Sequence, residues 1–80
     1  MIETSKTIKL RVNLGKLIRK YRLKRKLSQE TLAEKADIHR TYVSDIELGK
    51  VDISITVAYR LAHAVKISFG RLAKEAEETI

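Results

Sequence analysis

The sequence predicts a small all-α domain built from five helices. Proline is absent and glycine occurs only three times in 80 residues, so few positions interrupt a helix. Apolar residues recur three and four positions apart through most of the chain, which is the period of an amphipathic helix. A chain of this length forms one domain with a small core, and it has no cysteine to staple that core with a disulfide.

The first helix is expected over residues 13–25. Asn13 suits an N-cap, and Leu14, Leu17, Ile18 and Tyr21 then form one apolar stripe at helical spacing. Residues 1–12 are expected to be an N-terminal arm that precedes a domain of residues 13–78. Within this arm, residues 7–12 alternate like a short strand, yet they could equally extend the helix or form an arm against DNA.

Four further helices follow from their caps and apolar spacing. Ser28 is a suitable N-cap for a helix over residues 29–36, and a short turn at 37–38 leads into a helix over 40–47. Gly49 is expected to stop that helix. Ser54 and Ser68 then cap helices over residues 55–65 and 69–78.

The helix over residues 40–47 has one entirely polar side. At 100° per residue, Val43, Ile46 and Glu47 fall on one side of it. The opposite side carries four polar residues, which are Arg40, Thr41, Ser44 and Asp45. We therefore expect this second side to face solvent or a ligand.

The net charge of +7 and the sequence pI of about 9.9 point to a polyanionic partner. The first 26 residues hold ten lysines or arginines and a single glutamate, so the basic character belongs to the first third of the chain. Nucleic acid fits this pattern better than a membrane surface, because the basic helix has no Trp or Phe on its apolar side. No apolar run is long enough to span a membrane, and a cytoplasmic protein is expected.

Nothing in the sequence suggests catalysis or a cofactor. His39 and His63 lie far apart and have no ligand-like neighbours, so no metal site is expected. No nucleophile, base and orienting group form a plausible set. The chain is therefore not expected to be an enzyme, nor to act on a small-molecule substrate.

Residues 29–46 have the spacing of a helix-turn-helix unit. Counted from Gln29, apolar side chains fall at positions 4, 8, 10, 15 and 18, where two such helices must pack on each other: Leu32, Ala36, Ile38, Val43 and Ile46. Position 5 is Ala33, and only a small side chain there permits a close crossing. An ordinary amphipathic helical hairpin would meet some of these constraints, but the charge and the polar face favour a DNA-binding unit.

Residues 14–73 resemble the lambda-repressor-like family of helix-turn-helix regulators, also called the Xre or Cro family. The stretches "LSQETLAEKA" and "HRTYVSDIELGK" carry the resemblance, and the second is most similar to the controller proteins of restriction–modification systems. The resemblance implies a five-helix transcription regulator that binds a palindromic operator in double-stranded DNA as a homodimer. An antitoxin that also binds a toxin is the alternative.

The resemblance also assigns roles to individual residues. The positions expected to contact DNA are Ser28, Gln29, His39, Arg40, Thr41, Tyr42, Ser44, Asp45 and Lys50. Arg22 and Glu47 are expected to form a structural salt bridge. Asp37 stands where the family usually has glycine, and aspartate tolerates the left-handed backbone that this turn requires.

Dimerisation is inferred from the small size of the chain and from the family. The candidate interface residues are apolar and lie on or near the last helix: Ile53, Ile67, Phe69 and Leu72. They could instead only complete the monomer core. The sequence gives neither the operator nor the choice between activation and repression.

Overall fold

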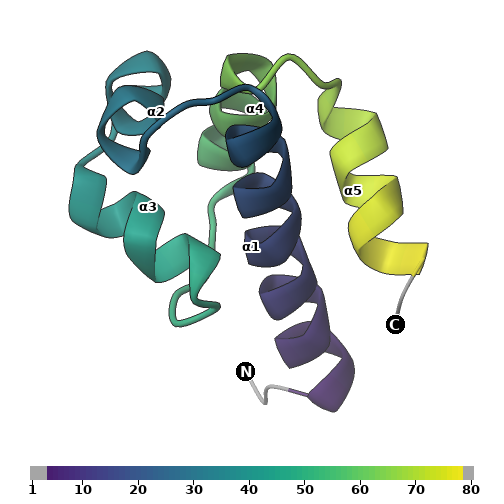
Figure 1. Ribbon diagram of the computed structural model, residues 1–80. Helices are drawn as coiled ribbons and strands as arrows, with labels where there is room; N and C mark the ends of the chain where they lie inside the picture. The colour runs from purple at the N-terminus through teal and green to yellow at the C-terminus, as the bar shows by residue number, and fades with distance from the viewer. Residues whose placement is uncertain (1–3, 79–80) are drawn as a thin grey trace.

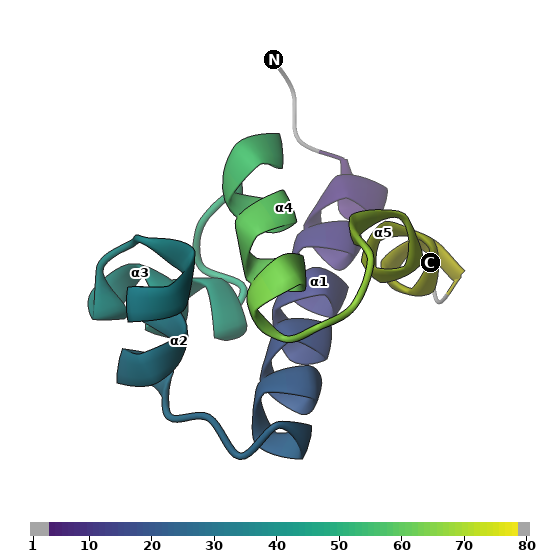
Figure 2. The ribbon, with the colours of Figure 1, turned by 90° about the horizontal axis from the view of Figure 1, so that it is seen from above.

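The computed structural model describes residues 4–78, and this range contains five α-helices and no strand. They are α1 (Ser5–Lys24), α2 (Gln29–Ala36), α3 (Arg40–Glu47), α4 (Ile55–Ala64) and α5 (Phe69–Glu78). The long α1 runs through the middle, with α2 and α3 on one side of it and α5 on the other (Figure 1). Seen from above, α4 lies between the α2–α3 pair and α5 (Figure 2). The all-α, five-helix prediction is confirmed.

The predicted start of the first helix is wrong. α1 begins at Ser5, eight residues before the expected N-cap Asn13, and it ends at Lys24. Of the three alternatives for residues 7–12, the extension of the helix is confirmed, and the strand and the arm are not present. Thr4 is the N-cap, because its Oγ1 accepts from the Thr7 N–H at 3.2 Å while Thr7 Oγ1 accepts from the Thr4 N–H at 3.0 Å. These reciprocal bonds form a capping box. Residues 1–3 of the predicted arm lie outside the described range.

The other helices begin where the sequence places them. Ser28, Ser54 and Ser68 each accept a hydrogen bond from the backbone N–H three positions on, at 3.0 to 3.1 Å. Such caps satisfy one of the donors that the first turn of a helix leaves unpaired. The helix expected over residues 55–65 ends one residue earlier, at Ala64.

The core forms where the helix-turn-helix pattern predicted it. Leu32, Val43 and Ile46 are completely buried, and Ala33 is nearly so. The sequence reading did not foresee how closely α1 approaches α3. A Cβ atom at Gly15 would overlap the Ile46 carbonyl oxygen, so only glycine allows this contact.

Four turns in the described residues use left-handed backbone, and the first of them follows α1 at Lys26, with φ 58°. Asp37, between α2 and α3, has φ 56° and ψ 49°, so the expected left-handed turn at this aspartate is confirmed. Gly49 ends α3 with φ 71°, and Lys66 follows α4 with φ 61°. Glycine adopts such angles without cost, whereas a lysine pays a steric penalty.

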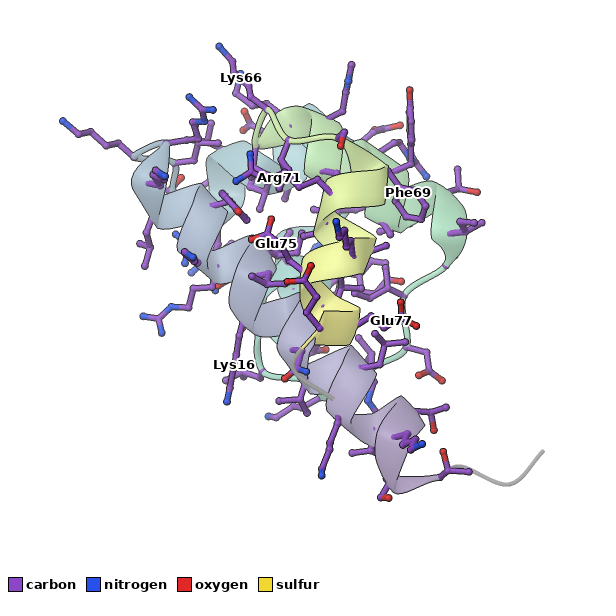
Figure 3. All side chains as sticks on the ribbon, turned by 90° about the vertical axis from the view of Figure 1, so that its right-hand side faces the viewer. Lys16, Lys66, Phe69, Arg71, Glu75 and Glu77 are labelled. Carbon is purple, nitrogen blue, oxygen red and sulfur yellow. The ribbon has the colours of Figure 1, made fainter. Side chains whose placement is uncertain are left out.

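A polar cluster fastens α5 to α1. The Tyr21 hydroxyl lies 2.7 and 2.8 Å from the two carboxylate oxygens of Glu75, and Arg71 Nε donates to Glu75 at 3.1 Å. Asn13 Nδ2 donates to the Ala76 carbonyl at 3.2 Å, so its side chain serves α5 rather than a helix cap. Figure 3 shows Arg71 and Glu75 along one edge of α5, with Phe69 and Glu77 along the other.

Two of the predicted dimer-interface residues lie in the core of the single chain, which is the alternative that the sequence left open. Leu72 is completely buried and Ile67 nearly so, and both belong to the core of the single chain. The helical phase of α5 explains the difference, because Leu72 and Ala76 are four positions apart and share the buried side. Phe69 and Ile53 are only partly buried.

The Tyr21–Glu75 contact makes the docking of α5 sensitive to acid. The hydrogen bond from Tyr21, aided by Arg71, holds the pKa of Glu75 below its ordinary value. A carboxyl with a lowered pKa in the folded state stabilises the fold at neutral pH, and this contribution is lost as the pH falls through that lowered pKa. We expect Tyr21→Phe to melt at a lower temperature than the wild type at pH 7, and the difference to shrink at pH 3. A difference of equal size at both pH values would contradict this account.

Candidate nucleic-acid interface

The polar side of α3 lies open at the surface. Arg40 and Thr41 in its first turn are exposed, while Ser44 and Asp45 are half-buried one turn further on. The Asp45 carboxylate has no ion pair or hydrogen-bond partner within residues 4–78. The four residues therefore form one face whose polar groups are available to a ligand, and no ion pair holds Arg40 to Asp45.

A buried ion pair fixes α3 on α1. Arg22 Nε lies 2.6 Å from Glu47 Oε2 and Arg22 Nη2 lies 2.9 Å from Glu47 Oε1, a bidentate geometry. Both residues are less than a tenth exposed. Arg22 also donates to the Leu27 carbonyl at 2.9 Å. The salt bridge that the resemblance implied is thus present, and it joins α1, the start of α2 and the end of α3.

The start of α2 contributes to the same network. Gln29 Nε2 donates to Glu47 Oε1 at 3.1 Å, so the amide group of Gln29 is fixed in orientation instead of hanging free in solvent. Ser28 Oγ accepts from the Thr31 N–H and donates to the Thr31 hydroxyl at 2.9 Å. The sequence reading placed both residues at this helix end but did not predict the bond from Gln29 to Glu47.

His39 is the N-cap of α3. Its Nδ1 accepts from the Thr41 N–H at 3.0 Å. A ring that accepts at Nδ1 carries its proton on Nε2 when neutral. The cap therefore fixes the orientation of the ring and leaves Nε2–H as its outward donor at the beginning of the polar face.

The loop between α3 and α4 is held against the first turns of α1. Arg11 donates from Nε to the Gly49 carbonyl at 3.1 Å and pairs with Asp52 at 3.3 Å. The Tyr42 hydroxyl donates to the Asp52 carbonyl at 3.3 Å, which fastens α3 to the same loop. Lys50 is exposed on this loop. Arg11 was missed in the sequence reading because it lay in the supposed arm.

The described residues contain neither a candidate metal site nor a candidate membrane span. Between residues 4 and 78, no group of three or more His, Cys, Asp or Glu side chains is placed to hold a metal ion. None of the helices in that range is long and apolar enough to cross a membrane.

Two short helices joined by a left-handed turn, the second presenting an exposed polar face, define a helix-turn-helix domain. The helix-turn-helix family model HTH_3 matches residues 18–72. The chain therefore belongs to this family of DNA-binding transcription regulators.

The chain is similar in sequence and structure to control proteins and to other regulators. It is 39% identical to the control protein C.BamHI of Bacillus amyloliquefaciens over 62 residues, which is 76% of each chain. The restriction–modification controller protein C.AhdI of Aeromonas hydrophila has a similar structure, with a TM-score of 0.73 and 36% identity over 76% of this chain and 92% of that one. The clp gene regulator ClgR of Corynebacterium glutamicum aligns with a TM-score of 0.82 and 27% identity, over 88% and 74% of the two chains.

Proposed function

We propose that this protein regulates transcription, including that of its own gene, by binding a palindromic operator as a homodimer. The observation that carries the proposal is the exposed polar face of α3, which the buried Arg22–Glu47 pair holds rigidly on α1. A recognition helix needs such a support, because base contacts require side chains held within a fraction of an ångström. The relation to restriction–modification controller proteins supports the same function.

We assign base reading to the polar face of α3. Arg40 is exposed in the first turn and can donate two hydrogen bonds to guanine O6 and N7. Thr41 can contact a thymine methyl group or a phosphate, and Ser44 can accept or donate at a base edge. Asp45 can accept from the N4 amino group of cytosine, and it repels phosphates and base acceptors.

We assign phosphate contacts to the rim of that face. The first turn of α2, with Ser28 and Gln29, presents backbone N–H groups whose helix dipole favours an anion. His39 offers its Nε2–H beside the start of α3. Lys50 and Tyr42 lie on or against the loop that follows α3 and complete the set.

An apolar groove supports the homodimer. It has a volume of about 350 Å³ and lies between the first half of α1, the start of α4 and α5. Its lining comprises Leu10, Leu14, Ile53, Ile55, Ala58, Phe69, Ala73, Ala76 and Glu77. Ile55 beside it is 72% exposed, which is unusual for a large apolar side chain on a small domain. A second copy related by two-fold symmetry would cover the same groove on both chains.

The role of the groove as the dimer interface can be tested by placing one charged side chain in it. We expect Ile55→Lys to convert a dimer into a monomer in sedimentation experiments, because the lysine would have to be buried at the interface. Leu23→Lys is the matched control, since Leu23 is 52% exposed on α1 and does not line the groove. A dimer that survives Ile55→Lys would remove this groove as the interface.

Selection from random DNA tests the function as a whole. A homodimer should select a palindrome whose half-sites lie about one helical turn, roughly 34 Å, apart. A match between that palindrome and the DNA upstream of the gene would support autoregulation. Recovery of no consensus would refute sequence-specific binding.

Asp45 has its own expected effect on binding. Asp45→Asn should bind random DNA more tightly, because it removes a negative charge from the groove-facing side. Its selected consensus should be less strict at one position in each half-site, since asparagine can both donate and accept. If Asp45→Asn and the wild type bind random DNA and the consensus operator with the same affinities, the carboxylate lies outside the groove.

A further inference from the structure

A basic pocket lies between the last turn of α2 and α4. Its volume is about 430 Å³, and its lining comprises Lys35, Tyr59, Arg60, His63, Ala64 and Lys66. α2 packs against α3 with one side and against α4 with another, and the two partners make few contacts with each other. None of the polar-face residues of α3 is among the lining of this pocket.

The positive charge of this pocket is almost uncompensated. Three of its six lining residues, Lys35, Arg60 and Lys66, are cationic at neutral pH, and no acidic residue is among the lining. The nearest counter-charge in the described chain is Asp37, whose carboxylate lies 3.9 Å from Arg60 Nη1 and is 97% exposed. A pair this long and this open to solvent contributes little.

Arg60 has a buried side-chain nitrogen that lacks a hydrogen-bond partner in the described chain. Its Nε is buried and has no hydrogen-bond partner among residues 4–78, although 40% of the side chain is exposed. A buried donor without an acceptor is costly. An oxyanion in the pocket would let the guanidinium turn so that Nε and a neighbouring Nη donate side by side, which is the geometry that arginine favours with phosphate.

Lys66 adds a cationic side chain to the lining of the pocket. It follows α4 with φ 61°, where glycine would be free of strain. Lys26 and Asp37 end α1 and α2 with the same left-handed backbone, so this geometry is the common form of a helix end in this chain. The contribution of Lys66 to the pocket is therefore its charge.

We propose that this pocket binds a phosphate monoester. The cationic residues supply the phosphate contacts. Tyr59 and His63 have nearly parallel rings whose centroids lie 5.8 Å apart, and both residues line the pocket together with the cations. Tyr59 is 57% exposed, and an exposed aromatic ring can stack on a ligand with a planar ring, as in a mononucleotide. The proposal does not depend on operator binding, and its first tests use no DNA.

The first test is a titration of the whole chain with inorganic phosphate at constant ionic strength, followed by NMR. We expect saturable shifts confined to the end of α2, to α4 and to the Arg60 Nε–H. Arg60→Gln should weaken binding roughly tenfold or more, whereas Arg19→Gln, an exposed arginine of α1 away from the pocket, should not. Shifts that never saturate, or an affinity unchanged in Arg60→Gln, would overturn the proposal.

Lys66→Gly separates ligand binding from a structural role. Glycine relieves the left-handed strain, so we expect the variant to melt at a higher temperature while binding phosphate more weakly. A more stable variant with undiminished phosphate affinity would exclude Lys66 from the site.

Nucleotide probes then identify the recognised group and its source. Adenosine 5′-monophosphate should cause the same shifts as phosphate, and adenosine should not; equal binding of adenosine would refute a phosphate site. The backbone of duplex DNA carries phosphodiesters, which present similar anionic oxygens to a cationic pocket. A loss of affinity in Arg60→Gln for an operator with long flanks, but not for a minimal operator, would assign the pocket to the phosphodiesters of flanking DNA and overturn a monoester site. If Arg60→Gln and the wild type bind both operators with equal affinity, the pocket serves a free phosphate ligand.

Discussion

Arg22→Met should lower the free energy of unfolding by about 3–5 kcal/mol, because it leaves the Glu47 carboxylate buried without its counter-ion. Glu47 would retain one hydrogen bond, the 3.1 Å contact from Gln29. Small domains are stable by only about 5–15 kcal/mol in total, so the variant should be close to unfolding at room temperature. Urea denaturation followed by circular dichroism measures the change.

Two further variants separate the ion pair from general effects of the substitution. Arg22→Met combined with Glu47→Leu should recover most of the loss, because no charge is then left buried. Arg19→Met removes an exposed arginine from the same helix and should change stability by less than about 0.5 kcal/mol. If Arg22→Met alone were as mild as this control, the bidentate pair would not be what fixes α3 on α1.

The helix ends that the sequence predicted well are those marked by a local signal. The serines at positions 28, 54 and 68 cap their helices as expected, and Gly49 ends α3 with a positive φ. These signals depend on residues within three positions of one another, and a single sequence contains all of that information.

The start of α1 was mispredicted because its cap is atypical. A capping box normally has Glu or Gln at its third helical position, but here Thr7 takes that place. The alternation of Ile8, Leu10 and Val12 also imitates a strand. The important contacts of this segment are distant in the sequence. Arg11 contacts Gly49 and Asp52, some 40 positions later, and no local pattern encodes that contact.

The sequence predicted which residues form the candidate site, but it did not predict the hydrogen bonds between them. Arg40, Thr41, Ser44 and Asp45 share a face because helical geometry requires it. The bond from Gln29 to Glu47 depends instead on how α2 and α3 cross, as does the contact of Gly15 with Ile46. The dimer-interface candidates show the same dependence on packing, because residue spacing alone did not reveal that Leu72 is completely buried in the single chain.

Arg40→Ala should reduce the sequence specificity of the protein strongly and its affinity for random DNA only slightly. If Arg40 donates two hydrogen bonds to a guanine, its loss costs about 1–3 kcal/mol at that position of each half-site. The preference for guanine there should disappear, so that an operator with a substituted base binds as well as the consensus. The measurement is a set of operators substituted one position at a time, each titrated at the same salt concentration.

The salt dependence of binding decides between a base contact and a phosphate contact. A phosphate contact adds about one unit to the slope of log affinity against log salt, and removing it weakens all sequences alike. Arg40→Ala should therefore leave the slope nearly unchanged and bind random DNA almost as well as the wild type. Lys50→Ala is the matched control, because an exposed lysine on the rim should reduce the slope and leave the base preference intact. An equal loss on operator and random DNA in Arg40→Ala would make Arg40 a phosphate contact and move base reading to Thr41, Ser44 and Asp45.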